Sequence, residues 1–299
     1  MELKSLVTFV EMAKSKTKRR LVVAAAGDLP VLEAVNNAQK EGIIDPILVG
    51  DKSEIEKISQ QIGFDLSNVE IIHEPDPVKA SIKAVAVIKE GRAEILMKGL
   101  VATGPLLKAV LDKENGLRKG GTISHIAFYE TPFYHKLLGV TDAAMNVAPE
   151  FDEKVAILQN AVEAFHKLGI KNPKVAVVAA VETVNPKMEA TVHAAMLTMM
   201  NKRKQIKGCI VDGPLAIDNA VSAEAAHHKG IESDIAGDVD IILTPDINCG
   251  NVLYKTLGFL GGATSAAVLM GAKVPIVLTS RSDSDRSKML SIALAAAMD

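Results

Sequence analysis

The chain has 299 residues, of which 48% are hydrophobic and 23% charged, and its formal net charge is -2 at pH 7. That length allows two lobes with buried cores, while the balanced charge lacks the basic excess typical of proteins that bind nucleic acid or anionic membranes. Residues 1–20 carry frequent charges, and no segment reaches the ~18 to 20 apolar residues of a membrane span, so we expect neither a signal peptide nor a membrane anchor. Two cysteines form no disulfide framework, which favours a reducing, cytoplasmic location.

Helices and apolar strands alternate along the first hundred residues. The pattern predicts helices at 1–18, 27–40, 54–62 and 74–90, and strands at 21–26, 46–49, 69–72 and 95–97. The strands are apolar throughout and only the turns between them are polar, as in a parallel sheet covered on both faces. The first part of the chain is therefore predicted to be an α/β lobe.

A second lobe is predicted after a change of pattern between Gly120 and Asp142, where short strands at 123–129 and 137–141 replace the alternating helices. Beyond them the pattern gives helices at 151–168, 187–201 and 217–229, and strands at 175–181 and 209–212. The last strand and helix are expected to return to the first lobe. The predicted domains are thus residues 1–125 with 273–299, and residues 126–272.

A lysine stands directly after the predicted strand 95–97. The segment Lys98-Gly99-Leu100-Val101-Ala102-Thr103-Gly104 places a charge and flexible backbone at the carboxyl end of that strand. We predict that Lys98 and Thr103 line a ligand site. The alternative is a loop whose glycines permit positive φ, with Lys98 in solvent.

Two polar turns near the carboxyl end of the chain follow apolar strands. Strand 239–243 runs into the turn 244–251, before a helix predicted from about Val252, and strand 274–278 runs into 279–285, which opens the last helix. Ligands of parallel α/β sheets bind at such strand ends and helix N-termini, and the planar donor fork of Arg281 matches phosphate oxygens. We predict a site for a phosphate-bearing ligand. The alternative is that these Ser, Asp and Asn residues are ordinary caps and turn residues.

Motifs of other ligand classes are missing. The sequence has no GxGxxG after an early strand and no GxxxxGK[ST], which argues against a dinucleotide fingerprint and a P-loop. It has no CxxC or HExxH, and His125, His135 and the pair His227 and His228 lack partners at metal-ligand spacing. We therefore predict no metal site.

The run TPDINCGNVLYK (244–255), followed by TSRSDS (279–284), resembles the phosphate acetyltransferase and phosphate butyryltransferase family. Four further segments resemble its butyryl branch in the same order, namely 94–111, 140–149, 179–197 and 206–222. The resemblance implies a two-lobe, three-layer α/β/α fold like that of isocitrate and isopropylmalate dehydrogenases, with the active site in a cleft between the lobes. It also implies a cytoplasmic acyltransferase that forms a homodimer or higher homo-oligomer.

The activity implied is acyl-CoA + phosphate ⇌ acyl phosphate + CoA, with a butyryl or similarly short acyl group. Coenzyme A would then be a substrate, with small molecules as partners and no cofactor. We assign phosphate binding to Arg281, the oxyanion to Ser280, and deprotonation of the thiol to Asp283, with Asp285 as the second choice. The other predicted substrate-binding residues are Lys98, Thr103, Asp246, Asn251, Lys255, Ser282 and Ser284.

Several alternatives remain open. The protein could be a phosphate acetyltransferase, a metal- and NAD-dependent dehydrogenase of the related fold, or a non-catalytic CoA-binding protein. Cys249 could form a covalent acyl-enzyme, because a thiol at a helix N-terminus can have a lowered pKa. A basic cluster could meet the phosphates of coenzyme A or be a solvated helix end; its members are Lys14, Lys16, Lys18, Arg19 and Arg20.

Overall fold

The computed structural model describes residues 2–279 and 283–298, which divide into two units. Unit 1 comprises residues 1–6 and 122–265, and unit 2 comprises residues 7–121 and 266–299. The predicted ranges placed residues 1–6 in the other domain. These residues join unit 1 because Leu3 O accepts a hydrogen bond from Leu137 N at 2.7 Å and Leu6 N donates to Glu130 at 2.8 Å.

The sheet of unit 2 has the strand order β3-β2-β1-β4-β11-β10, in which the first five strands are parallel and β10 is antiparallel to β11. The elements of this unit are α1 (Val7–Lys14), β1 (Arg19–Ala24), α2 (Leu29–Lys40), β2 (Ile44–Gly50), α3 (Lys52–Ile62), β3 (Glu70–His73), α4 (Pro77–Lys89), β4 (Ile95–Lys98), α5 (Thr103–Val110), β10 (Thr264–Met270), β11 (Ile276–Val277) and α11 (Asp285–Ala297).

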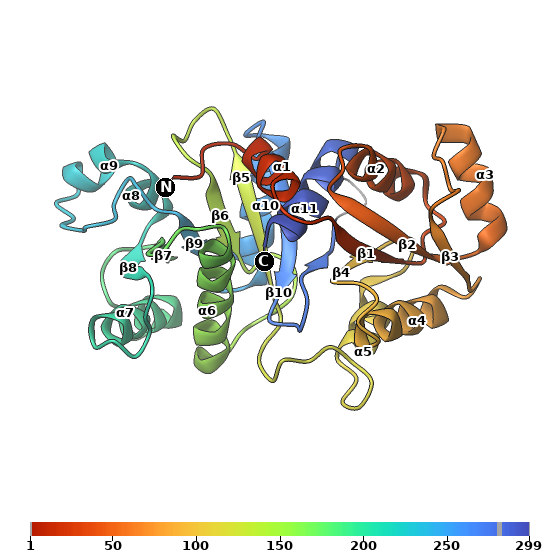
Figure 1. The fold of residues 1–299 in the computed structure, drawn as a ribbon. Helices are drawn as coiled ribbons and strands as arrows, with labels where there is room; N and C mark the ends of the chain where they lie inside the picture. The colour runs from red at the N-terminus through yellow and green to blue at the C-terminus, as the bar shows by residue number, and fades with distance from the viewer. Residues whose placement is uncertain (1, 280–282, 299) are drawn as a thin grey trace. The chain divides into compact units, whose positions relative to one another are not determined.

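Helices cover both faces of the unit 2 sheet. Because βαβ crossovers are right-handed, α2 and α3, which lead outward from β1 to β3, lie on one face, and α4, which leads back to β4, lies on the other. In Figure 1 α2 and α11 lie together on one side of this sheet, and α4 and α5 on the other. Double coverage explains why β1 is a run of buried apolar residues from Leu21 to Ala24 rather than an alternating strand.

The strand order of unit 2 reverses between β1 and β4. After β1 the chain moves away through β2 and β3, and it then returns to pair β4 with β1 on the other side, with Ala24 opposite Lys98. The loops that leave β1 and β4 therefore diverge toward opposite faces. Such a topological switch point leaves a crevice at the carboxyl ends of the strands, where α/β proteins bind their ligands.

Unit 1 has the strand order β5-β6-β9-β7-β8, with β6, β9, β7 and β8 parallel and β5 antiparallel to β6. Its elements are β5 (Ser124–Glu130), β6 (Leu138–Thr141), α6 (Phe151–Lys167), β7 (Lys174–Val178), α7 (Glu189–Lys202), β8 (Ile210–Leu215), α8 (Ile217–Val221), α9 (Ala223–His228), β9 (Ile241–Leu243) and α10 (Ile247–Phe259).

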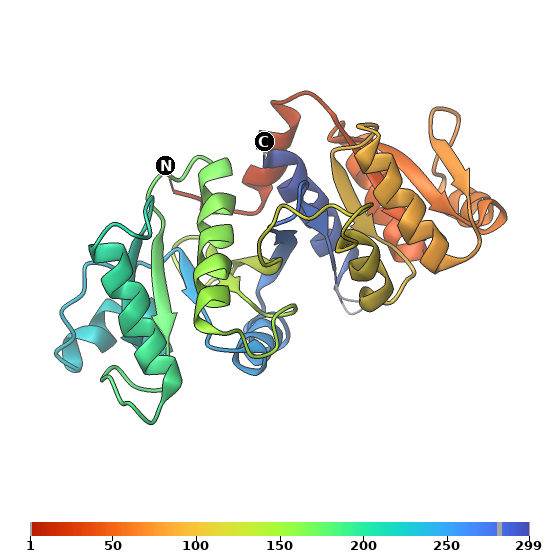
Figure 2. The same cartoon turned by 90° about the horizontal axis from the view of Figure 1, so that it is seen from below.

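The same handedness places the helices of unit 1 in two layers. The crossovers through α6 and α7 lead toward β8 and share one face, where Figure 2 shows the two helices side by side. The crossover through α8 and α9 leads back to β9 and lies on the other face. The switch point of this unit falls between β6 and β9, where Thr141 lies opposite Leu243. Each unit is thus a three-layer α/β/α structure, as the sequence predicts.

Several predicted elements need correction. The helix predicted from about Val252 begins at Ile247, because the Asp246 side chain caps it. The helix predicted at 217–229 is two helices, because Ser222 leaves the helical conformation and its Oγ caps α9 by accepting from Ala225 N at 3.2 Å. The first helix is shorter than predicted, and α5 and β10 were not predicted. No helix in the described ranges is long and apolar enough to cross a membrane.

Candidate active site

A cavity of about 170 Å³ lies at the β1/β4 switch point of unit 2. Its walls come from the start of α2, the loop after β4, the end of the β11 segment and the first turns of α11. The lining residues are Asp28, Pro30, Val31, Lys98, Gly99, Leu100, Thr279 and Lys288. The cavity therefore brings together residues that are up to 260 positions apart in the chain (from Asp28 to Lys288).

The loop after β4 is pressed against the end of β1. Gly99 N donates to Ala24 O at 2.8 Å and Leu100 N donates to Ala25 O at 2.7 Å. A Cβ at Gly99 would lie 2.2 Å from Ala25 O, which no side chain can tolerate. This close backbone approach, rather than a positive φ, requires glycine, since neither Gly99 nor Gly104 has a positive φ.

Lys98 is half-buried and its ammonium is held at the cavity wall. Lys98 Nζ donates to Gly99 O and to Val101 O, both at 3.2 Å. The alternative that placed Lys98 in solvent is wrong, because these two carbonyls fold the side chain back over its own loop. The predicted neighbour Thr103 begins α5 and does not line this cavity.

The first turns of α11 supply a lysine that the sequence patterns did not single out. Lys288 is only 4% exposed, lines the cavity, and donates from Nζ to the main-chain oxygen of Asp283. No signal in the sequence marks this lysine, because it follows Asp285, Arg286 and Ser287 in a polar first turn and looks like another exposed charge. Asp28, which precedes α2, was likewise not predicted as a site residue.

The predicted catalytic segment adjoins the cavity in sequence. Thr279 lines the cavity, and Ser280, Arg281 and Ser282 follow it but lie outside the described residues. Asp283 is half-buried, and its main-chain oxygen accepts from the cavity lysine Lys288.

Ser284 is the N-cap of α11. Its Oγ accepts a hydrogen bond from Ser287 N at 3.1 Å. Ser284 was predicted to bind substrate, and this contact matches the alternative that it is an ordinary helix cap. The alternative base, Asp285, is exposed in the first turn of the same helix.

A second group of polar residues surrounds the β6/β9 switch point of unit 1. Asp142, which is 3% exposed, accepts hydrogen bonds from the backbone N–H groups of Ala144, Met145 and Asn146 at 2.9 to 3.2 Å. Thr244 Oγ1 donates to main-chain oxygens of Thr141 and Asp142 at 3.2 Å. These bonds fix the loop after β6 against the start of α10.

The remaining predicted substrate residues lie on α10 or at its start. Asp246 Oδ1 accepts from Asn248 N at 2.8 Å and from Cys249 N at 3.0 Å, so this oxygen caps the helix. Asn251 Nδ2 donates to Ala143 O at 3.1 Å, and Lys255 Nζ lies 5.8 Å from the centre of the Tyr254 ring. All three residues belong to unit 1, whereas Lys98, Thr103, Asp283 and Ser284 belong to unit 2.

Comparison with known proteins gives a family. A family model described as phosphate acetyl/butaryl transferase matches residues 5–79 and 73–296. The chain belongs to this family. Membership confirms the resemblance read from 244–255 and 279–284, and it makes the chain an acyltransferase.

Relatives within the phosphate acetyl/butaryl transferase family match almost the whole chain. A phosphate butyryltransferase of Clostridium acetobutylicum is 51% identical over 98% of this chain and 98% of that protein. A phosphate acetyltransferase of Thermotoga maritima is 46% identical over 97% of this chain and 98% of that protein. Both acyl names therefore occur among relatives of nearly equal similarity.

Solved structures support the same fold. A branched-chain phosphotransacylase from Enterococcus faecalis V583 has a TM-score of 0.84 and 35% identity, over 94% of this chain and 98% of that chain. A 4-hydroxythreonine-4-phosphate dehydrogenase from Klebsiella pneumoniae has a TM-score of 0.55 and 15% identity, over 93% of this chain and 98% of that chain. The second likeness concerns the fold alone, and it agrees with the predicted two-lobe, dehydrogenase-like fold class.

Cys249 does not have the environment of an activated nucleophile in this family member. Desolvation and, secondly, the nearby Asp246 carboxylate raise the pKa of the Cys249 thiol above its ordinary value. This is the opposite of the lowered pKa that the acyl-enzyme alternative requires.

We expect Cys249→Ala to keep kcat within about twofold of the wild type, because a thiol with a raised pKa provides little thiolate for covalent catalysis. Steady-state turnover and the size of any pre-steady-state burst would check this. A drop of several orders of magnitude would restore the covalent alternative.

The basic cluster near the end of α1 is engaged within unit 2. Lys14 pairs with Glu41, Arg20 pairs with Glu94 at 2.8 Å, and Lys16 Nζ donates to Ala297 O at 2.8 Å. These contacts favour the solvated helix end over a phosphate-binding role. Within residues 2–279 and 283–298, no group of three or more His, Cys, Asp or Glu side chains is placed to hold a metal ion.

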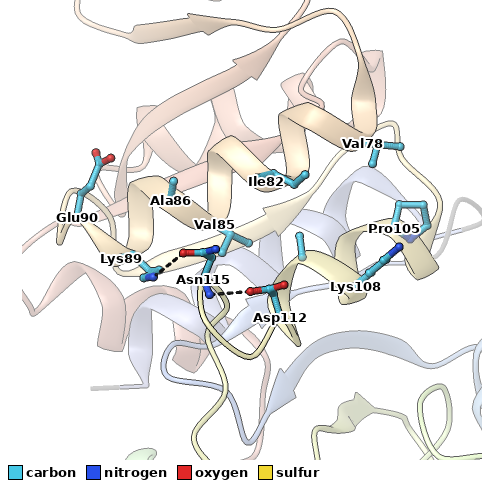
Figure 3. A pocket seen from close by; sticks show the side chains of 11 residues that line it. Val78, Ile82, Val85, Ala86, Lys89, Glu90, Pro105, Lys108, Asp112 and Asn115 are labelled. Atoms are coloured by element: carbon cyan, nitrogen blue, oxygen red, sulfur yellow. Dashed lines mark hydrogen bonds between the residues drawn. The ribbon is translucent and has the colours of Figure 1, made fainter.

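A larger groove lies elsewhere on unit 2, between α4 and α5. It measures about 680 Å³ and is lined by apolar residues such as Val78, Ile82 and Pro105, with Lys89 and Lys108 at its edges (Figure 3). None of the predicted site residues lines this groove. No described residue of the family signature segments 244–255 and 279–284 is among the residues that line this groove, so we do not assign it to the active site.

Proposed function

We propose that the chain transfers a butyryl or similarly short acyl group between coenzyme A and inorganic phosphate. The observation that carries this proposal is the cavity at the β1/β4 switch point, which is lined by Lys98, Thr279 and Lys288. Thr279 directly precedes the segment 280–282 in the sequence. Two ammonium groups, one at the end of β4 and one in the first turns of α11, favour a small anion such as phosphate. The names of the relatives, phosphate butyryltransferase and phosphate acetyltransferase, support the same reaction.

The proposed reaction exchanges one bond at the acyl carbonyl carbon. A phosphate oxygen attacks the thioester carbon, a C–O bond forms, the C–S bond breaks, and the electron pair leaves with the CoA thiolate. In the reverse direction the CoA thiol loses its proton, the thiolate attacks the carbonyl of the acyl phosphate, and phosphate leaves intact. No P–O bond breaks in either direction.

Each step needs a group that the predicted segment contains. Arg281 offers a planar donor fork for phosphate oxygens, and Ser280 offers a hydroxyl to the oxyanion of the tetrahedral intermediate. Asp283 would take the thiol proton in the reverse direction and return it to the leaving thiolate in the forward direction. An aspartate base is useful because the ordinary thiol pKa of ~8.5 leaves little thiolate at neutral pH.

The acyl preference is a separate part of the proposal. The match to the Clostridium acetobutylicum protein and the Lys98–Gly104 loop favour butyryl, while the similar Enterococcus faecalis protein is a branched-chain phosphotransacylase. Coenzyme A as substrate, the absence of a cofactor and a homodimer belong to the proposal too. The roles of Thr103, Asn251 and Lys255 in substrate binding remain predictions.

The experiment measures phosphate-dependent release of CoA from acetyl-, butyryl- and isobutyryl-CoA. We expect the highest kcat/KM with one of the two four-carbon substrates, because each extra methylene buried in an apolar pocket is worth about 1 kcal/mol, or several-fold in kcat/KM. A clear preference for acetyl-CoA would make the chain a phosphate acetyltransferase instead.

A further inference from the structure

Lys288 is a buried cation in the cavity at the β1/β4 switch point. It is 4% exposed, and its described hydrogen bond goes to the uncharged main-chain oxygen of Asp283. In the part of the chain that the structure describes, no carboxylate forms an ion pair with it. Burying an ammonium without a counter-charge is costly, so such a group normally has an anionic partner.

A second ammonium faces the same cavity. Lys98 lines the cavity, and its Nζ donates to the uncharged carbonyls of Gly99 and Val101. Asp28 is the carboxylate among the lining residues. Two cations and one carboxylate leave the cavity with a net positive charge, which favours an anion.

The volume of the cavity limits the size of that anion. That volume is about 170 Å³. It is well below the ~300 to 1,000 Å³ of pockets that enclose drug-sized ligands. An anion of about five heavy atoms fits this space, whereas a whole acyl-CoA does not.

We propose that Lys288, together with Lys98, binds the anionic oxygens of the phosphoryl group of inorganic phosphate and of acyl phosphate. This inference rests on the proposed function, and it adds two lysines from outside the segment 280–282 to the residues proposed to bind phosphate. Asp28 accepts the hydrogen bond of the single proton on monohydrogen phosphate, since an ionised carboxylate can only accept. The bond from Lys288 to Asp283 O ties the occupied subsite to the residue proposed as base.

Phosphate groups also occur on coenzyme A, and the test separates the two sources. The variants are Lys288→Met, which removes the charge at similar length, and Lys288→Arg, which keeps it. The matched control is Lys154→Met, because Lys154 is also 4% exposed but lies on α6 of unit 1, where its Nζ contacts His193 Nδ1 at 2.9 Å. Calorimetric titration with inorganic phosphate gives Kd, and steady-state kinetics gives KM for phosphate, acyl phosphate and CoA.

For Lys288→Met we expect Kd and KM for phosphate and acyl phosphate to rise by about 10- to 100-fold, the loss of one charge-assisted contact. KM for CoA should stay within about twofold, Lys288→Arg should recover part of the affinity, and Lys154→Met should bind phosphate like the wild type. Unchanged phosphate affinity in Lys288→Met would overturn the inference. A weaker affinity for CoA alone would overturn it too, because the site would then bind a phosphate group of coenzyme A.

A second variant covers the case in which Lys288→Met does not fold. Lys98→Met alters a half-buried side chain of the same cavity and should show the same selective loss of phosphate affinity. If Lys98→Met bound phosphate as tightly as the wild type, the proposed subsite would be wrong. A different outcome would show that the proposed function is wrong: the wild-type protein would bind phosphate in the calorimeter but release no CoA from acyl-CoA.

Discussion

Replacement of Asp283 by Asn is expected to lower kcat by about 10²- to 10⁴-fold with little change in KM for either substrate, because general-base catalysis acts in the transition state. Asp283 is half-buried and directly precedes Ser284, the N-cap of α11. The main-chain oxygen of Asp283 also receives the hydrogen bond of Lys288, so the residue is fixed beside the cavity.

The pH dependence distinguishes loss of a base from loss of structure. As pH rises toward the thiol pKa of ~8.5, solvent supplies the thiolate, so acyl phosphate consumption by Asp283→Asn should recover toward the wild-type rate. A merely misfolded variant would not recover. Asp285→Asn is the matched control, because Asp285 is exposed in the first turn of the same helix. If Asp285→Asn loses activity and Asp283→Asn does not, the base is Asp285.

Gly99→Ala is expected to destabilise unit 2 strongly. The added Cβ would lie 2.2 Å from Ala25 O and 2.7 Å from Ala24 O, and both are backbone atoms at the end of a buried strand. Overpacking of this kind costs about 1 to 3 kcal/mol or more, and we expect the upper end because backbone cannot rotate away. The thermal midpoint should fall by roughly 5 to 10 °C. KM for phosphate should rise as well, because the loop that carries Lys98 must move.

Gly104→Ala is the control from the same loop. Gly104 lies in the first turn of α5 and is exposed, and a Cβ added there would meet no atom within 4 Å. Alanine is favoured over glycine in helices by up to ~1 kcal/mol, so this variant should be as stable as the wild type or slightly more stable. Equal effects of the two substitutions would mean that the loop needs glycine for flexibility rather than for close packing.

The strands that are buried on both faces are the elements that the sequence predicts best. The strands β1, β2 and β4 are recovered within a few residues, because both faces are covered and the run of apolar residues is continuous. Helix starts are harder. The apolar pattern of α10 begins near Val252, but Asp246 caps a helix that starts five residues earlier, at Ile247. Asn248, Cys249 and Asn251 are therefore helical instead of turn residues.

In the candidate site, the sequence predicted a residue that is marked by its neighbours in the chain, and it missed one whose place depends on long-range packing. Lys98 was found because it stands at the end of a recognisable strand. Lys288 was missed because its place in a cavity depends on the packing of α11 against α2 and β11, which no local pattern encodes. Asp246 and Ser284 show how a local pattern can mislead, since both were predicted to bind substrate and both cap a helix. Helix caps and phosphate sites use the same residue types.

The most direct measurement of the central claim follows the oxygens of phosphate. The protein is incubated with butyryl-CoA and ¹⁸O-labelled phosphate, and CoA and butyryl phosphate are quantified by mass spectrometry. We predict that CoA release requires phosphate, that one butyryl phosphate forms for each CoA, and that all phosphate oxygens keep their label, because only the carbonyl carbon exchanges its bond. Release of CoA without phosphate, with butyrate as the product, or no release from any short acyl-CoA, would contradict the assignment.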